Sequence, residues 1–187
     1  MSADTSADQM ILVDEHDNPI GNAPKLPVHQ QGLLHRAVSV ILWDGEGRFL
    51  LQRRAATKYH SPGLWSNTCC GHPRPGESAG AAARRRLADE MGISCEIGPL
   101  FTMRYRGGVA GELIENELVH VFGGSFAGVP QPDPSEVWEW DWRDSAEIRR
   151  AITDEPAAYT IWFRNLCDEF WDELQASAAG TKAGYAQ

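Results

Sequence analysis

The chain has 187 residues, 42% of them hydrophobic and 23% charged, which is typical of one globular domain with a substantial core. Its formal net charge of −9 disfavours nucleic acid as a partner, because contacts with phosphate backbones need a basic surface. No apolar run approaches 18 residues, so we expect no membrane-spanning helix and no membrane partner.

Both ends of the chain are small and polar. We therefore expect disordered tails at residues 1–9 and 176–187 around a single domain at residues 10–175. The opening MSADTSADQM lacks the basic start and apolar segment of a signal peptide, which predicts a cytoplasmic protein. In that compartment Cys69, Cys70, Cys95 and Cys167 are expected as thiols, without disulfides.

The first half of the domain is typical of β-structure. Residues 10–13 form a short apolar strand candidate, and a turn follows at 14–18. Two β-rich runs, 37–44 and 48–53, flank Gly45-Glu46-Gly47 and predict a hairpin. Residues 61–76 are rich in Pro and Gly and predict an ordered loop.

The second half alternates between strands and helices. Residues 77–91 contain no proline, place Ala83, Leu87 and Met91 four apart, and end before Gly92, which predicts a helix. Further strands are expected at 95–105, 112–126 and 136–142, and further helices at 144–152 and 157–175. This order favours an α+β fold, or a mixed sheet between helices.

The most informative segment is residues 71–93, GHPRPGESAGAAARRRLADEMGI, which resembles the loop–helix box of the Nudix superfamily. Seven positions are in register, namely Gly71, Glu77, Arg85, Leu87, Glu90, Gly92 and Ile93. Asp89 replaces one Glu, and Arg86 stands where Nudix hydrolases carry a metal-binding Glu. Arg86 and Glu90 lie at i and i+4, so one side chain can hold a phosphate while the other holds a metal ion. The alternative is an ordinary exposed ion pair. Of the neighbouring arginines, Arg84 is expected in solvent and Arg85 in a structural ion pair.

Histidines and carboxylates surround this box. His29 and His35 precede it, His72 lies within it, and Glu115 and Glu117 point to one face of a predicted strand. Two carboxylates on one face repel each other unless a cation or a proton lies between them. Three imidazoles with two carboxylates suit Zn²⁺ or Mn²⁺ better than Mg²⁺. His16, His60 and His120 are expected to be ordinary surface or capping residues.

Residues 66–73, S-N-T-C-C-G-H-P, carry a candidate reactive thiol. A cysteine beside a metal-bound histidine would have its thiolate favoured by the nearby positive charge. The alternative is that the cysteines are small buried fillers, which is the interpretation for Cys69, Cys95 and Cys167.

Several motifs together resemble the type I isopentenyl-diphosphate isomerases over residues 10–170. They are T-C-C-G-H-P, the Arg-containing box, E-N-E at 115–117, Lys25 with His29 and His35, R-R-A-x-x-K at 53–58, P-G-x-W at 62–65 and R-Y-R at 104–106. The resemblance implies the Nudix α/β/α sandwich and interconversion of isopentenyl and dimethylallyl diphosphates in isoprenoid biosynthesis.

The resemblance also implies a role for each matching residue. Cys70 and Glu117 are the implied catalytic pair, with Tyr105 beside Glu117. A divalent metal (Mn²⁺, Zn²⁺ or Mg²⁺) is implied at His29, His35, His72, Glu115 and Glu117. A Mg²⁺ ion arriving with the diphosphate is implied at Glu90 and the main-chain carbonyl of Cys70. The implied substrate-binding residues are Lys25, Arg54, Lys58 and Arg86, with Trp162 over the carbocation; core packing is the alternative for Trp162.

Two other functions are open on the sequence. A Nudix pyrophosphohydrolase acting on a nucleoside diphosphate derivative predicts Glu at position 86, where the chain has Arg. A non-enzymatic, metal-stabilised binding domain predicts that Cys70 is dispensable. A monomer or a weak homodimer is the default expectation for assembly.

Overall fold

The computed structural model describes residues 9–58, 60–109 and 111–180, which form one domain. The expected tails at 1–8 and 181–187 lie outside the described residues. The expected boundaries are wrong in two places, because residue 9 begins a strand and residues 176–178 complete the last helix. In the described part, no helix is both long and apolar enough to cross a membrane.

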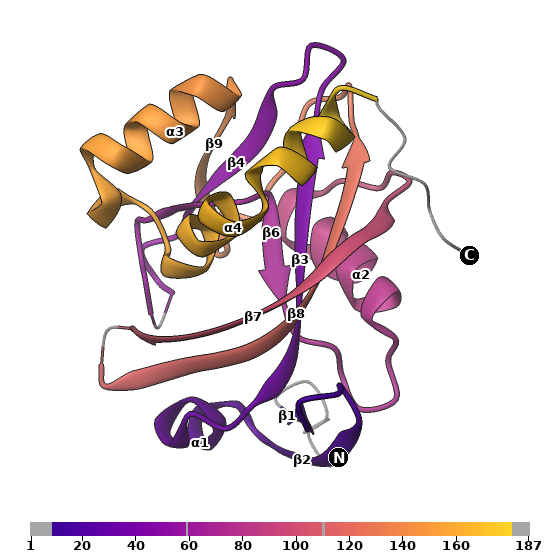
Figure 1. The fold of residues 1–187 in the computed structure, drawn as a ribbon, viewed down its shortest axis with the longest axis vertical. Coiled ribbons are helices and arrows are strands. Elements are labelled where there is room, and N and C mark those ends of the chain that lie inside the picture. Colours follow the sequence, from indigo (N-terminus) through magenta and orange to yellow (C-terminus); the bar gives the residue numbers. More distant parts are fainter. Residues whose placement is uncertain (1–8, 59, 110, 181–187) are drawn as a thin grey trace.

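Within the described residues, nine strands form one strongly curled mixed sheet (Figure 1). They are β1 (Gln9–Val13), β2 (Pro19–Pro24), β3 (His35–Trp43), β4 (Phe49–Arg54), β5 (Trp65–Ser66), β6 (Cys69–Gly71), β7 (Gly98–Val109), β8 (Leu113–Ser125) and β9 (Val137–Arg143). Strand β3 is the centre, since it pairs antiparallel with β1, β4 and β6 and parallel with β8. The sheet therefore brings distant segments to either side of one strand.

Helices cover both faces of this sheet (Figure 1). The α-helices are α1 (Lys25–Gln31), α2 (Ala79–Met91), α3 (Ser145–Asp154) and α4 (Ile161–Ala178), with a short 3₁₀ turn η2 (Pro156–Ala158). Alternate residues of β3 enter two cores: Ala37 and Ile41 pack on the α3/α4 side, while Val38 and Val40 pack on the α2 side. This arrangement confirms the α/β/α sandwich.

Every predicted strand and helix is present, with ends shifted by a few residues. The predicted helix at 77–91 begins at Ala79 because Ser78 caps it, accepting a hydrogen bond from the Ala81 amide at 3.2 Å. It ends at Gly92, whose φ of 62° suits glycine. The loop expected at 61–76 instead contains β5 and β6, and the prediction missed β2 and α1.

Candidate active site

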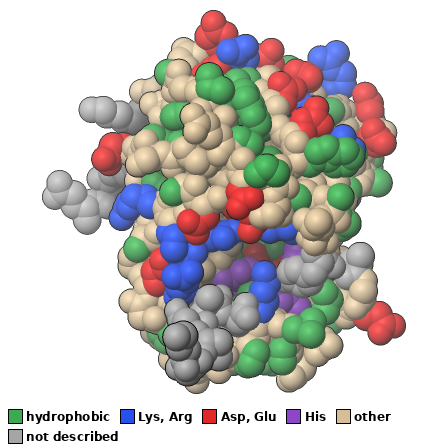
Figure 2. Space-filling view, turned by 180° about the vertical axis from the view of Figure 1, so that it is seen from behind, with side chains coloured by type: hydrophobic (Ala, Val, Ile, Leu, Met, Phe, Trp, Pro, Cys, Tyr) green, Lys and Arg blue, Asp and Glu red, His purple; other side chains and the backbone are tan. Residues whose placement is uncertain are grey.

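A cavity of about 300 Å³ opens beside the α4-covered face of the sheet. Figure 2 shows Lys and Arg side chains gathered at the rim of a hollow in which histidines are visible. All but two of the predicted site residues line this cavity. The two exceptions, His29 and His35, contact Glu115 and Glu117, which do line it. The lining predicted residues are Lys25, Arg54, Lys58, Cys70, His72, Arg86, Glu90, Tyr105, Glu115, Glu117 and Trp162.

The imidazole cluster is assembled by strand register and by α1. His35 on β3 pairs directly with Glu117 on β8, and its Nε2 lies 3.5 Å from Glu117 Oε1. His72, which follows β6, places Nε2 3.0 Å from the same oxygen. His29 comes from α1 and lies 3.2 Å from Glu115 Oε2. The ligand atoms of His29, His35, His72 and Glu117 lie within 4.8 Å of one another.

This cluster fits a divalent cation because of where the ring nitrogens point. Nδ1 of His29 lies 2.9 Å from the Lys25 carbonyl, and Nδ1 of His35 lies 2.8 Å from the Leu33 carbonyl. A carbonyl only accepts, so each Nδ1 carries the proton, and a neutral ring presents an Nε2 lone pair to a carboxylate. Two lone pairs can face each other only with a proton or a cation between them. Backbone hydrogen bonds that fix the rings in this way are typical of metal-ligating histidines.

Charge within the cluster is divided unequally. Burial and the neighbouring Glu117 raise the pKa of Glu115. Burial acts in the same direction on Glu117, but the close contacts of its carboxylate with His35 and His72 outweigh burial and hold the pKa of Glu117 well below its usual range. Burial lowers the pKa of His72 to about 3, so this ring is neutral at pH 7.

Tyr105 lies on β7 opposite Glu117 and donates its hydroxyl to Glu117 Oε2 at 2.8 Å. Burial and the nearby carboxylate charge raise the pKa of Tyr105 well above its usual range. The phenol therefore keeps its proton near neutral pH and stays a hydrogen-bond donor. Tyr105 therefore lies beside Glu117, as the family resemblance implies.

Cys69 and Cys70 point to opposite faces of the sheet, as neighbours in a strand do. Cys69 is fully buried in the core under α2, whereas Cys70 packs on the α4 side and lines the cavity. The filler interpretation of Cys69 therefore agrees with its position, and so does that of Cys167, buried in the α4 core. Cys95, half-buried against the α2 core, is also a free thiol.

The Cys70 thiol is held by an internal polar chain. Its Sγ donates to Asn67 Oδ1 at 3.2 Å and lies 3.5 Å from the Ser39 hydroxyl. Ser66 also donates to Asn67 Oδ1, at 3.0 Å, and accepts from the Trp162 indole at 2.8 Å. Burial raises the pKa of Cys70 to about 12, so the thiolate expected from nearby positive charge is not the form that the protein alone favours.

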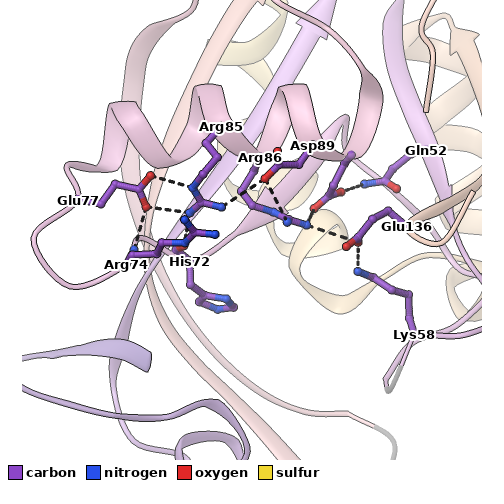
Figure 3. Close-up of polar contacts among 10 residues, drawn as sticks. Gln52, Lys58, His72, Arg74, Glu77, Arg85, Arg86, Asp89 and Glu136 are labelled. Carbon is purple, nitrogen blue, oxygen red and sulfur yellow. Dashed lines mark hydrogen bonds and ion pairs between the residues drawn. The ribbon is translucent and has the colours of Figure 1, made fainter. Parts of the chain in front are cut away.

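The cationic end of the cavity is centred on Arg86 (Figure 3). Arg86 contacts Glu90 Oε1 at 2.5 Å and Glu136 Oε2 at 3.4 Å, and Glu136 also pairs with Lys58. The predicted sharing of one helix face by Arg86 and Glu90 agrees with this geometry. The sequence prediction missed Glu136, which precedes β9 and sits between two predicted phosphate-binding cations.

The loop before α2, residues 72–78, is anchored to α2 beside the cationic end of the cavity. Arg85 pairs with Glu77, with two nitrogen–oxygen distances of 2.8 Å, and Glu77 also accepts from the Arg74 amide (Figure 3). Arg84 is exposed. Both expectations for these arginines agree with the structure. A Cβ at Gly71 would lie 2.7 Å from Cγ of Arg86, so the side chain of Arg86 needs glycine there.

Arg54 lines the cavity, but two of its guanidinium nitrogens already donate hydrogen bonds to main-chain carbonyls. Its Nε and Nη2 donate to the carbonyls of Ser61 and His60, both at 3.2 Å, and its Cζ lies 5.1 Å from the Trp162 ring centroid. Trp162 is itself 8% exposed and packs in the α4 core. Trp162 therefore lines the cavity and also packs in the core.

His60 corrects the expectation of an ordinary surface residue. It is only 6% exposed, and its Nε2 lies 3.2 Å from Glu115 Oε1. Burial and the charge of Arg54 lower its pKa to about 3, so the ring is neutral at pH 7. The other two histidines are closer to expectation: His16 is exposed, and the half-buried His120 lies 2.9 Å from Asp17.

Comparison with known proteins identifies the family of this site. The NUDIX domain family matches residues 33–163. Isopentenyl-diphosphate Delta-isomerase 2 of Aromatoleum aromaticum is 47% identical, covering 94% of this chain and 93% of its own. Isopentenyl-diphosphate Delta-isomerase of Serratia proteamaculans is also 47% identical, covering 91% of this chain and 99% of its own.

Solved structures agree on the fold. DR0079 from Deinococcus radiodurans is 17% identical with a TM-score of 0.69, covering 95% of this chain and 99% of its own. A MutT protein from Methanosarcina mazei is 22% identical with a TM-score of 0.62, covering 75% and 94%. Since the isomerases match along nearly the whole chain, the protein belongs to the isopentenyl-diphosphate Delta-isomerase family of the Nudix superfamily.

Proposed function

We propose that the protein interconverts isopentenyl diphosphate and dimethylallyl diphosphate, with Cys70 and Glu117 as the two catalytic groups. The observation that carries the proposal is their placement: β6 and β8 flank β3, and both side chains line one cavity. The cationic end around Arg86 adjoins that cavity and suits the diphosphate. Family membership supports the same reaction.

The reaction needs an acid and a base on opposite sides of a carbon skeleton, with water excluded. We assign the delivery of a proton to C4 of isopentenyl diphosphate to Glu117 and Tyr105 together, because the Tyr105 hydroxyl keeps its proton and is hydrogen-bonded to the ionised Glu117 carboxylate. This step converts the alkene to a tertiary carbocation. Cys70, as thiolate, then removes a proton from C2, and the electron pair of that C–H bond forms the new double bond. The proton gained and the proton lost balance, so the product is an isomer.

Trp162 and the basic side chains have supporting roles in this proposal. The Trp162 ring lines the cavity, where its π face can stabilise the cation by about 2 kcal/mol once water is excluded. Lys25, Lys58 and Arg86 hold phosphate oxygens, with Arg54 contributing the part of its guanidinium that the loop does not use. Glu136 must then release Lys58 and Arg86 or share them with the diphosphate.

We propose two metal positions. His29, His35, His72, Glu115 and Glu117 hold one divalent ion (Mn²⁺, Zn²⁺ or Mg²⁺), while Glu90 and the Cys70 carbonyl hold Mg²⁺ carried by the diphosphate. When bound, these ions supply positive charge that offsets the diphosphate and favours the Cys70 thiolate. Glu90 oxygens accept from Gln52 at 2.8 Å and contact Arg86, and these contacts orient the carboxylate.

The remaining assignments concern surroundings and partners. The four cysteines are free thiols, which suits a reducing compartment such as the cytoplasm. We propose a protein that acts there on a small isoprenoid diphosphate, as a monomer or weak homodimer, without nucleic acid or membrane partners.

Turnover in deuterated water tests the proposal. Incubation with isopentenyl diphosphate, Mg²⁺ and Mn²⁺ should produce dimethylallyl diphosphate that carries deuterium, together with labelled substrate from the reverse reaction. Mass spectrometry of both compounds measures the label. Absence of label and of product would overturn the proposal.

The rival pyrophosphohydrolase makes a different prediction for the same protein. It requires phosphate release from a nucleoside diphosphate derivative with Mg²⁺ alone. Arg86 in place of the hydrolase Glu argues against it, because a cation stands where the hydrolase site needs a further carboxylate for its metal ions. Release of phosphate without allylic product, measured across a panel of nucleotides, would favour the hydrolase.

A further inference from the structure

His60 lies between the imidazole cluster (His29, His35 and His72) and the hydrophobic wall of the cavity, which is formed by Trp162 and Leu166. Its ring centroid lies 6.0 Å from that of His29 and 5.8 Å from the Trp162 ring, which it meets at an interplanar angle of 85°. Two hydrogen bonds from Arg54, to the carbonyls of residues 60 and 61, fix the loop that carries it. The imidazole is therefore placed by the chain around it and not by solvent.

Glu115 is held from two sides by imidazoles. His29 Nε2 lies 3.2 Å from Oε2 of Glu115, and His60 Nε2 lies 3.2 Å from Oε1. The Glu115 side chain is 3% exposed, so water supplies little of its hydrogen bonding. A buried carboxylate next to another carboxylate needs such partners, because without them its two oxygens can rotate or take up a proton.

His60 is not itself placed as a metal ligand. The ligand atoms that gather within 4.8 Å belong to His29, His35, His72 and Glu117, and His60 is outside this group within the part of the chain that the structure describes. Its Nδ1 lies 3.4 Å from the Ser61 hydroxyl, which can donate to it. Nε2 can then carry the ring proton and donate it to Glu115.

We infer that His60 is a positioning residue of the metal site, which donates to Oε1 of Glu115 and so keeps Oε2 directed at the imidazole cluster. The inference rests on the metal position proposed above and extends it by one residue outside the ligands. Residues that orient a ligand in this way commonly change metal affinity by about 10- to 100-fold when they are replaced. Since the ring also meets Trp162, one loop residue spans the metal site and the hydrophobic wall.

Four variants separate the hydrogen bond from the ring. His60→Gln places an amide N–H near the position of Nε2, whereas His60→Asn is one carbon too short to reach Glu115. His60→Phe keeps the ring and loses the donor. His120→Phe is the matched control, because His120 lies on the same strand as Glu115 but pairs with Asp17.

The measurement is the Mn²⁺ affinity of the full chain, first freed of metal by chelation, from the electron paramagnetic resonance signal of unbound Mn²⁺. We expect His60→Gln and His120→Phe to bind within about threefold of wild type, and His60→Asn and His60→Phe to bind about tenfold more weakly. If His60→Phe does not fold, the Gln and Asn variants still decide, because they differ only in reach.

Two results overturn the inference while leaving the proposed function intact. One is wild-type Mn²⁺ affinity in both His60→Asn and His60→Phe. The other is His60→Gln binding as weakly as the variants that lack the donor. A wild-type protein that does not bind Mn²⁺ overturns the metal position itself, and with it the role of His60, whatever the outcome of the turnover assay.

Discussion

At the scale of single residues, the two adjacent cysteines show how strand geometry separates a core residue from a site residue. Cys70 lines the cavity beside Ser39 and Asn67, while Cys69 lies in the core under α2. Both side chains are thiols, so a difference in activity or stability between their alanine variants is due to their positions in the fold. This makes the pair an internal control for the proposed base.

Cys70→Ala should lower kcat by at least about 100-fold, because a positioned acid or base contributes roughly 10²- to 10⁴-fold. Its free energy of unfolding should change by less than about 1 kcal/mol, since only the hydrogen bond to Asn67 and a half-buried sulfur are lost. Product formation and urea unfolding measure the two quantities.

Cys69→Ala should show the opposite pattern. It leaves a small cavity in a core residue of 0% exposure, which costs about 1 kcal/mol, and kcat should stay within about threefold of wild type. Loss of turnover in Cys69→Ala with retention in Cys70→Ala would contradict the assignment.

Gly71 tests the cationic end of the cavity without removing a charge. In Gly71→Ala the new Cβ would lie 2.7 Å from Cγ of Arg86, and the guanidinium must move away from its present place. We expect KM for isopentenyl diphosphate to rise about tenfold, equivalent to about 1.4 kcal/mol, with a smaller effect on kcat. Gly108→Ala is the matched control, because nothing lies within 4 Å of a Cβ there. Equal KM values for the two variants would count against a phosphate-binding role of Arg86.

At the scale of elements, the loop–helix unit formed by residues 71–78 and α2 depends on an ion pair that pH can break. The Arg85 guanidinium hydrogen-bonds Glu77 and lowers the pKa of that carboxyl below its usual value. A carboxyl whose pKa is lowered by folding stabilises the protein above its unfolded pKa, and this contribution is lost as pH falls through the folded value.

Glu77→Gln should therefore reduce the free energy of unfolding by about 1 kcal/mol at pH 7, and the difference from wild type should shrink as pH falls below about 4. Urea unfolding at several pH values measures this. Glu46→Gln is the control: its side chain is 76% exposed and its contact to Arg48 is 3.4 Å, so its effect should stay within about 0.5 kcal/mol. A Glu77→Gln effect of constant size from pH 7 to pH 3 would show that charge is not its origin.

The elements that the sequence predicts well are those whose pattern is local. The β-rich apolar runs of β3 and β8, the Ser78 cap and the Gly92 stop are each encoded within a few neighbouring residues. Helix α1 was missed because it has only seven residues and contains Pro27. This proline is tolerated because it lies in the first turn, but without the helix start a proline in so short a segment argues against a helix. Strands β5 and β6 have two and three residues, too few for an alternation to be visible.

The site follows the same division. Motif spacing and family resemblance indicated the imidazoles, both glutamates and Arg86. Strand register then places His35 and Tyr105 beside Glu117. His60 and Glu136 were missed because their roles depend on distant partners: Glu115 is 55 positions from His60, and Arg86 is 50 positions from Glu136. Nothing in the local sequence of Glu136 distinguishes it from the other 25 acidic residues of the chain.

At the scale of the whole molecule, the metal position joins parts of the chain that are far apart in the sequence. Its proposed ligands come from α1, β3, the segment after β6 and β8. Among the described residues, the hydrophobic clusters on the two faces of the sheet contain none of these ligands, so they should hold the fold without metal. Metal binding is then expected to stabilise a protein that is already folded.

This expectation separates the enzyme from a metal-stabilised binding domain. With Mn²⁺ at about 100 times its dissociation constant, linkage adds about 2.7 kcal/mol to the free energy of unfolding. For a chain of this size the Tm should rise by roughly 5–10 °C. Chelation at 25 °C should therefore abolish turnover while leaving the far-ultraviolet circular dichroism unchanged, and added Mn²⁺ should restore activity. His29→Ala, which lacks one ligand, should show a much smaller Mn²⁺-dependent rise in Tm. Loss of the circular dichroism signal on chelation would instead mean that the His and Glu cluster is needed for folding, as the non-enzymatic alternative requires.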